Sequence, residues 1–127
     1  LVVWRERDAF VLMNRYPYNG GHVLVIPTRH VGDPAELDAP TWARLTDLLR
    51  RTAIIVTQAL SAEGANLGMN LGQVAGAGIT DHLHFHVVPR WNGDTNFMPV
   101  VGDTKVISEA LTTSWAVLKA AFEAAKH

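Results

Sequence analysis

The 127-residue sequence contains no cysteine. A disulfide framework, a zinc site built from thiolates and a cysteine nucleophile are therefore all excluded within it. It also has no apolar run close to the roughly 18 residues that a membrane-spanning helix needs. Its first residues lack the basic start and long apolar stretch of a secretory signal. From these absences we predict no membrane partner and a cytoplasmic location.

The sequence has no excess of charge of either sign, because 11 Lys and Arg face 12 Asp and Glu, for a formal net charge of -1. Nothing in this balance favours binding to nucleic acid, and a polyanionic ligand would have to be held locally. Hydrophobic residues make up 48% and charged residues 18%, which is typical of a globular chain. The length fits a single domain over residues 1–127. Leu1 lies inside an apolar run, so we expect the natural N-terminus to be missing.

Several short apolar runs have the length and composition of strands. Residues 2–4 and 10–13 flank a charged stretch and predict a hairpin, whereas residues 22–26, bounded by Gly and Pro, predict a buried strand. Residues 65–71 predict a further strand, and residues 82–88 alternate in a period of two up to a proline that is expected to end the strand. Too few residues separate the first strands for parallel crossovers, which favours an antiparallel sheet.

Two segments show the spacing of amphipathic helices. In residues 41–60 and 108–126, apolar side chains recur every three or four positions. The expected inward stripes are Trp42, Leu45, Leu49, Thr52, Val56 and Leu60 in the first, and Leu111, Trp115, Leu118 and Phe122 in the second. Helices of unequal spacing among antiparallel strands predict an α+β fold. The small residues between positions 72 and 78 predict a loop that a ligand can approach closely.

Five of the six histidines stand at positions 22, 30, 82, 84 and 86. In a strand, alternate residues share a face, so His82, His84 and His86 are expected to point one way and their apolar neighbours into the core. Neighbouring imidazoles would then be about 6.6 Å apart at the usual rise of a strand. Three histidines in register are unusual for a surface without function, where Thr, Lys or Glu are more common.

Two chemical interpretations of this cluster remain open. A metal ion could take two of the three histidines, with a third ligand from His22, His30, Asp81 or Asp94, but His82 and His86 would be about 13 Å apart, too far to share one ion. Alternatively, one neutral imidazole acts as a nucleophile while its neighbours carry protons or charge. A phosphorus centre suits that arrangement, because its transition state spreads negative charge over oxygens that backbone N–H groups of a small-residue loop can reach.

These residues resemble a known family. The run from His82 to Val88, HLHFHVV, is similar to the histidine triad motif of the histidine triad (HIT) superfamily, in which three alternating histidines precede two apolar residues. Residues 14–30, NRYPYNGGHVLVIPTRH, resemble the Asn, Gly-His, Leu-Val, Pro and His framework of that family, and residues 70–72 its polar-x-Gly segment. Residues 89–97 look like the branch that contains the fragile histidine triad protein and bacterial diadenosine tetraphosphate phosphorylases.

The resemblance implies a five-stranded, mainly antiparallel sheet with one long central helix and a C-terminal helix, assembled as a homodimer. It implies cleavage of dinucleoside polyphosphates, with adenine nucleotides as ligands, at the α-phosphorus through a nucleotidyl-histidine intermediate. His84 would attack the phosphorus, His82 and His86 would hold oxygens and orient the nucleophile, and His22 would lie near phosphate or leaving group. Residues implied to contact the nucleotide are Asn14 near the ribose, Asn70 at the phosphate, Trp91 near the adenine, Gly72 and Gly78.

The chain departs from the family pattern before the triad. Where relatives place Gln or Ser to bind phosphate, it has Ala77, Gly78 and Ile79, so both water and phosphate are retained as acceptors of the second step. We predict no resident metal and no required cofactor, and Mg²⁺ accompanying the polyphosphate stays open. A purine nucleoside phosphoramidase and a nucleotide-binding protein with little activity are the alternatives to the predicted enzyme.

Overall fold

A five-stranded antiparallel sheet forms the centre of the computed structural model, which describes residues 1–15, 20–76, 82–94 and 104–125, with side chains left out for 104–110. The strand order is β1-β2-β3-β5-β4, so β1 and β4 are the edges. The strands are β1 (Val2–Arg5), β2 (Ala9–Met13), β3 (Val23–Pro27), β4 (Gly64–Gly68) and β5 (Phe85–Arg90). This architecture confirms the predicted α+β class. Within the described residues, no helix is both long and apolar enough to span a membrane.

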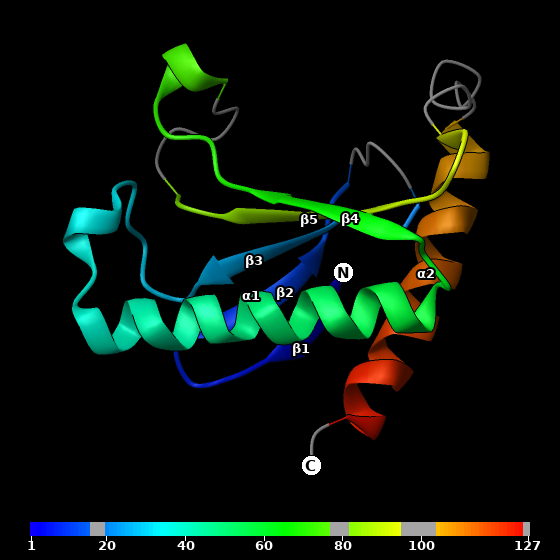
Figure 1. The fold of residues 1–127 in the computed structure, drawn as a ribbon, viewed down its shortest axis with the longest axis horizontal. Helices are drawn as coiled ribbons and strands as arrows, with labels where there is room; N and C mark the ends of the chain where they lie inside the picture. Colours follow the sequence, from blue (N-terminus) through cyan, green and yellow to red (C-terminus); the bar gives the residue numbers. More distant parts are fainter. Residues whose placement is uncertain (16–19, 77–81, 95–103, 126–127) are drawn as a thin grey trace.

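Helix α1 (Ala39–Ala59) runs across one face of the sheet (Figure 1). It begins where the side chain of Asp38 accepts a hydrogen bond of 2.8 Å from the backbone N–H of Thr41, which satisfies one of the free donors of the first turn. The helix starts two residues before the predicted boundary. Its buried positions also differ in part from the predicted stripe, because Leu48 is fully buried and Leu49 only half-buried.

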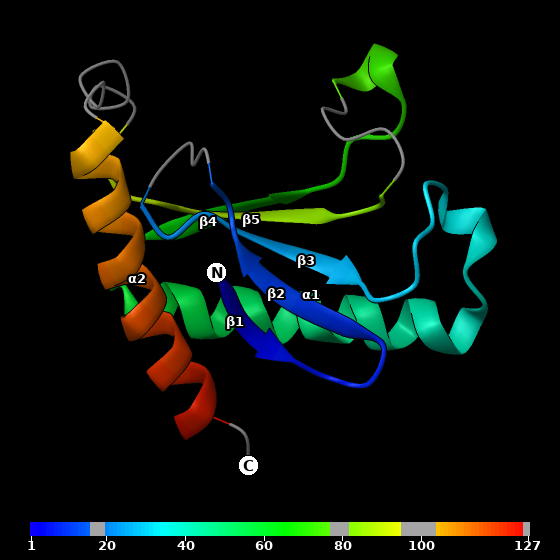
Figure 2. The same cartoon turned by 180° about the vertical axis from the view of Figure 1, so that it is seen from behind.

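Helix α2 (Thr104–Ala124) packs beside α1 and β1, as the view from behind shows (Figure 2). It begins four residues before the predicted start at 108. Leu118 and Phe122 are buried, and the Phe122 ring stacks on Trp4 of β1 at 5.9 Å between centroids. The hydrophobic core therefore lies between the sheet, α1 and α2.

The first three strands lie close to their predicted positions, but the last two do not. β4 ends at Gly68, three residues before the prediction, and β5 runs from Phe85 through Pro89 to Arg90. Pro89 was expected to end this strand. It is tolerated because the pairing of β5 with β3 ends at Val87, so the missing N–H removes no hydrogen bond on that side.

Candidate functional site

The structure brings four of the histidines into one row. His22 follows the turn at Gly21, His86 lies in β5, and His82 and His84 precede β5 instead of lying within the predicted strand. The ring centroids of His22 and His86 are 5.1 Å apart, and those of His84 and His86 are 4.8 Å apart. The second distance is shorter than the spacing of about 6.6 Å expected for a regular strand, and His84 lies just before β5.

Gly21 places His22 in this row. Its φ of +79° lies in the left-handed region that glycine adopts readily. A Cβ atom at this position would meet Cδ1 of Leu60 at 2.2 Å and Cγ of Pro89 at 3.3 Å. The chain can turn here and bring His22 against β5 only because position 21 has no side chain.

A backbone carbonyl fixes the orientation of His84. Its Nδ1 lies 3.0 Å from the carbonyl oxygen of His82. Since a carbonyl oxygen can only accept, Nδ1 carries the hydrogen and donates it. The neutral His84 ring therefore has its lone pair on Nε2. The His84 side chain is half-buried, so it is neither part of the core nor fully exposed to solvent.

His82 holds the segment that precedes β5. Its Nε2 donates to the carbonyl oxygen of Pro27 at 2.9 Å, and the backbone N–H of the buried Leu83 donates to Val31 at 2.7 Å. Together these bonds tie the segment to the chain that follows β3. The carbonyl of His82 in turn orients His84, and the contact of His82 with a phosphate oxygen stays a prediction. His30 contacts the His82 ring from outside, at 4.9 Å between centroids.

His22 and His86 form a hydrogen-bonded pair, with 2.9 Å between Nε2 of His22 and Nδ1 of His86. Burial, followed by the nearby His86 and His84, lowers the pKa of His22 to about 4. Burial, followed by His84, also lowers the pKa of His86. Both rings are therefore neutral at pH 7. The unfolded chain takes up a proton at His22 near pH 6.5, so stability is lost as the pH falls from there toward 4.

An apolar floor lies beside His86, on the face of the sheet away from α1. Directly paired residues share a face, and the pairs Val2 with Leu12, Leu12 with Leu24, and Leu24 with His86 form one continuous row. The other face of the sheet, which α1 covers, carries Val87, and this residue belongs to the hydrophobic core. Sequence reasoning missed this floor, because the period of each strand shows which residues share a face but not which strands are neighbours.

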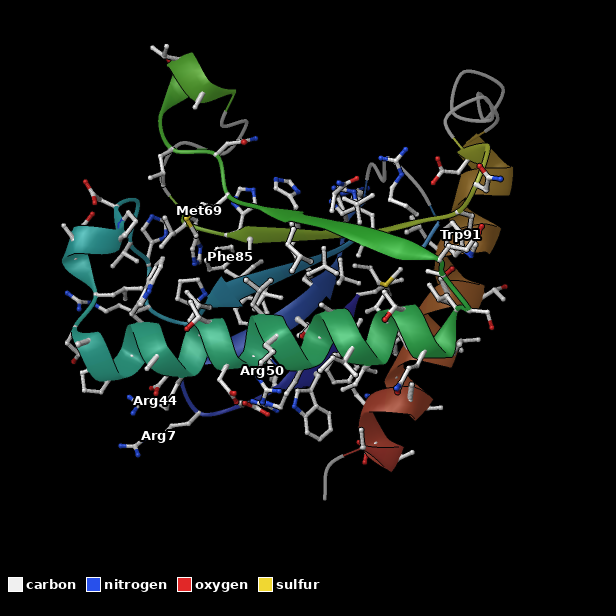
Figure 3. The ribbon with its side chains drawn as sticks, viewed as in Figure 1. Arg7, Arg44, Arg50, Met69, Phe85 and Trp91 are labelled. Carbon is white, nitrogen blue, oxygen red and sulfur yellow. The ribbon has the colours of Figure 1, made fainter. Side chains whose placement is uncertain are left out.

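Asn70 and Gly72 lie at the end of the sheet where the histidines gather. Gly68 pairs with His86, and Figure 3 shows Met69, the next residue, near Phe85 at the same end. Asn70 is exposed. Gly72 has a φ of +74°, a positive value that glycine adopts readily, just before the next turn. Gly78 lies outside the described residues, as does Asp81.

Trp91 does not join this cluster within one chain. It follows the far end of β5 (Figure 3), roughly 20 Å from His84 at the usual rise of a strand. Its Nε1 donates to the carbonyl oxygen of Ser61, and its backbone N–H donates to the buried Asp94. Within one chain Trp91 therefore lies apart from these histidines, and its contact with the nucleotide stays a prediction. Asp94 is also ion-paired with Arg90 at 2.8 Å, at the same distant end of β5.

No set of three or more His, Asp or Glu side chains that could hold a metal ion is found in the described part of the chain. The histidines instead bond to backbone carbonyls and to one another. The prediction of an imidazole site without a resident metal stays a prediction.

Comparison with known proteins identifies the family. Residues 1–93 match the model described as the HIT domain. The chain belongs to the HIT-domain family. A structure of a hypothetical histidine triad nucleotide-binding protein from Sulfolobus tokodaii has 29% identity and a TM-score of 0.84, and the match covers 98% of this chain and 85% of that one. The resemblance seen in the sequence and the fold it implied are both confirmed.

Two curated relatives of this HIT chain are enzymes by name. The AP-4-A phosphorylase of Mycobacterium tuberculosis is 38% identical over 123 residues, which cover 91% of this chain and 63% of the relative. The bis(5'-nucleosyl)-tetraphosphatase of Schizosaccharomyces pombe is 34% identical over 96 residues, covering 73% of this chain and 50% of that protein. The chain therefore spans less than two thirds of the length of either relative.

Proposed function

We propose that this HIT protein cleaves dinucleoside polyphosphates of the diadenosine tetraphosphate type at the α-phosphorus, through a nucleotide bound covalently to His84. One observation carries the proposal: Nδ1 of His84 donates a hydrogen bond to the carbonyl oxygen of His82 at 3.0 Å, which leaves the lone pair of the neutral ring on Nε2. A neutral imidazole oriented in this way is a nucleophile at neutral pH. The two enzymes named above support the choice of substrate.

The reaction proceeds in two displacements. Nε2 of His84 forms a bond to the α-phosphorus while the bond to the polyphosphate oxygen breaks, and the electron pair leaves with that oxygen. The His84 ring then carries positive charge, which the His82 carbonyl stabilises through the Nδ1 hydrogen bond. In the second step, an oxygen of water or phosphate attacks the phosphorus, and the breaking P–N bond returns its electron pair to Nε2.

The surroundings of His84 supply the other contacts. The half-buried Val2 and Leu12 with Leu24 form an apolar floor on which a purine base can be buried, beside His86. We expect His86 to bond an oxygen of the α-phosphate, and the fully buried His22 to hold the His86 ring from behind through the hydrogen bond between them. Asn70 approaches the same region from the end of β4. Gly72 has no side chain that would cover the backbone of the following turn. A contact between Gly78 and phosphate stays a prediction from the sequence.

The acceptor of the second step is tested by comparing products with and without inorganic phosphate. With diadenosine tetraphosphate as the substrate, phosphorolysis is expected to give ADP and ATP, whereas hydrolysis gives AMP and ATP whether or not phosphate is present. The measurement is chromatography of the products at matched turnover. Absence of any cleavage under both conditions would contradict the proposed activity. Adding EDTA to the same reactions tests the expectation that Mg²⁺, if it assists, enters only with the substrate.

We also propose that the chain forms a homodimer through the free edge of β4. Among the described strands, β4 pairs only with β5, so its other edge is available for a second sheet. Leu67 and Leu71 are about half exposed near this edge, at 49% and 48%. Light scattering is expected to give the mass of two chains, and Leu67→Glu to give one. A single-chain mass for the unaltered protein at micromolar concentration would contradict the proposal.

A further inference from the structure

The side-chain amide of Asn14 lies close to both nitrogens of the His22 ring. The two residues face each other just beyond the β2–β3 ladder, where the backbone N–H of Asn14 donates to the carbonyl oxygen of His22 at 3.0 Å. The side-chain Nδ2 of Asn14 lies 3.1 Å from Nδ1 and 3.3 Å from Nε2 of the same ring. Nδ1 and Nε2 of the ring are both bonded to Cε1. An Nδ2 atom in the plane of the ring at these two distances would therefore collide with Cε1. The amide therefore lies over the face of the ring.

This placement affects the two protonation states of His22 differently. An amide N–H over a ring face is attracted by the π electrons of a neutral ring, as a weak hydrogen bond. The same N–H is repelled by an imidazolium, which carries a positive charge. His22 is fully buried, so water does not solvate the imidazolium form of its ring. Its edge is meanwhile engaged with Nδ1 of His86 at 2.9 Å.

We propose that Asn14 is a positioning residue, whose amide holds His22 neutral and edge-on to His86 by covering the face of the His22 ring. This role differs from the ribose contact that the family resemblance implies for Asn14. Its consequence for catalysis rests on the proposed function: a neutral His22 places no positive charge of its own beside His86 and keeps the pair in one arrangement beside the α-phosphate. The role itself concerns the protein without substrate and can be measured there.

The test is a titration of the histidine rings, followed by nuclear magnetic resonance in the protein without nucleotide. Burial lowers the pKa of His22 to about 4 in the unaltered protein. In Asn14→Ala this pKa is expected to rise by about half a pH unit, which is the size of one weak N–H to ring contact. In the isosteric Asn14→Asp it is expected to rise further, because a carboxylate stabilises the imidazolium. Asn92→Ala, an exposed position at the far end of β5, is the matched control and should leave His22 unchanged.

An unchanged titration of His22 in Asn14→Ala would overturn the proposal, whatever the aspartate variant shows. If the alanine variant does not fold, an unchanged His22 in Asn14→Asp would overturn it as well. In the active enzyme, the acid limb of the kcat profile of Asn14→Ala is expected at higher pH than in the parent, whereas loss of a ribose contact alone would raise KM and leave that limb in place. If the protein proves inactive on dinucleoside polyphosphates, the proposed function fails, but the His22 titration still decides the role of Asn14.

Discussion

Replacement of His84 by alanine is expected to lower the turnover of diadenosine tetraphosphate by at least about a thousandfold, as removal of a covalent nucleophile does in other enzymes. The reason is local. Only His84 combines a half-exposed ring with an Nδ1 hydrogen fixed on a backbone carbonyl, among the histidines that the structure describes. The free energy of unfolding should change by less than about 1 kcal/mol, because the lost hydrogen bond is a single partly exposed one.

The matched control for this variant is His30→Ala. His30 is exposed and contacts the cluster only through the ring of His82. Its removal deletes an imidazole next to the row without touching the bond between His84 and the His82 carbonyl, so turnover should stay within about threefold of the parent. Equal turnover in His84→Ala and His30→Ala would show that His84 is not the nucleophile. Steady-state kinetics with both variants at one protein concentration provide the comparison.

Gly21→Ala is expected to destabilise the fold by about 2 to 4 kcal/mol and to reduce turnover strongly. An alanine at a φ of +79° is strained, and its Cβ would lie 2.2 Å from Cδ1 of Leu60 and 3.3 Å from Cγ of Pro89. Left-handed backbone costs an L residue about 1 to 2 kcal/mol, and overpacking about 1 to 3 kcal/mol more. The strain is relieved only if the turn shifts, and this moves His22 away from His86.

The neighbouring glycine provides the control. A Cβ at Gly20 would meet nothing within 4 Å, and Gly20 is not among the positive-φ residues of the structure. Gly20→Ala should therefore leave the free energy of unfolding within about 0.5 kcal/mol of the parent. Urea denaturation of the two variants measures the difference. If both alanines have the same small effect, the account of the turn before His22 is wrong.

The sequence predicted the architecture better than the site. Helical spacing located α1 and α2 to within a few residues. β2 and β3 were placed almost correctly, because β2 alternates in burial and β3 is a continuous apolar run bounded by Gly21 and Pro27. The end of β4 and the start of β5 could not be predicted in this way. Whether His82 and His84 belong to a strand depends on bonds to Pro27 and Val31, which are distant in sequence.

The spacing of His82, His84 and His86 indicated a candidate site, but it did not predict the geometry of that site. The alternation correctly indicated one shared location, whereas the pairing of His22 with His86 required knowing that β3 and β5 are neighbours. The same information reveals the apolar floor that includes Leu24. It also separates Trp91 from the cluster, since a residue that follows the triad closely in sequence lies at the other end of an extended strand.

The central claim is that Nε2 of His84 becomes covalently nucleotidylated during each cycle. The most direct test is to mix the enzyme with diadenosine tetraphosphate, quench within the first turnovers at alkaline pH, where phosphoramidate bonds persist, and locate the adduct by mass spectrometry of the peptides. The account predicts one adenylyl group on His84, and none in His84→Ala. Full turnover by the enzyme with no adduct, or with the adduct on His82, His86 or His22, would contradict it.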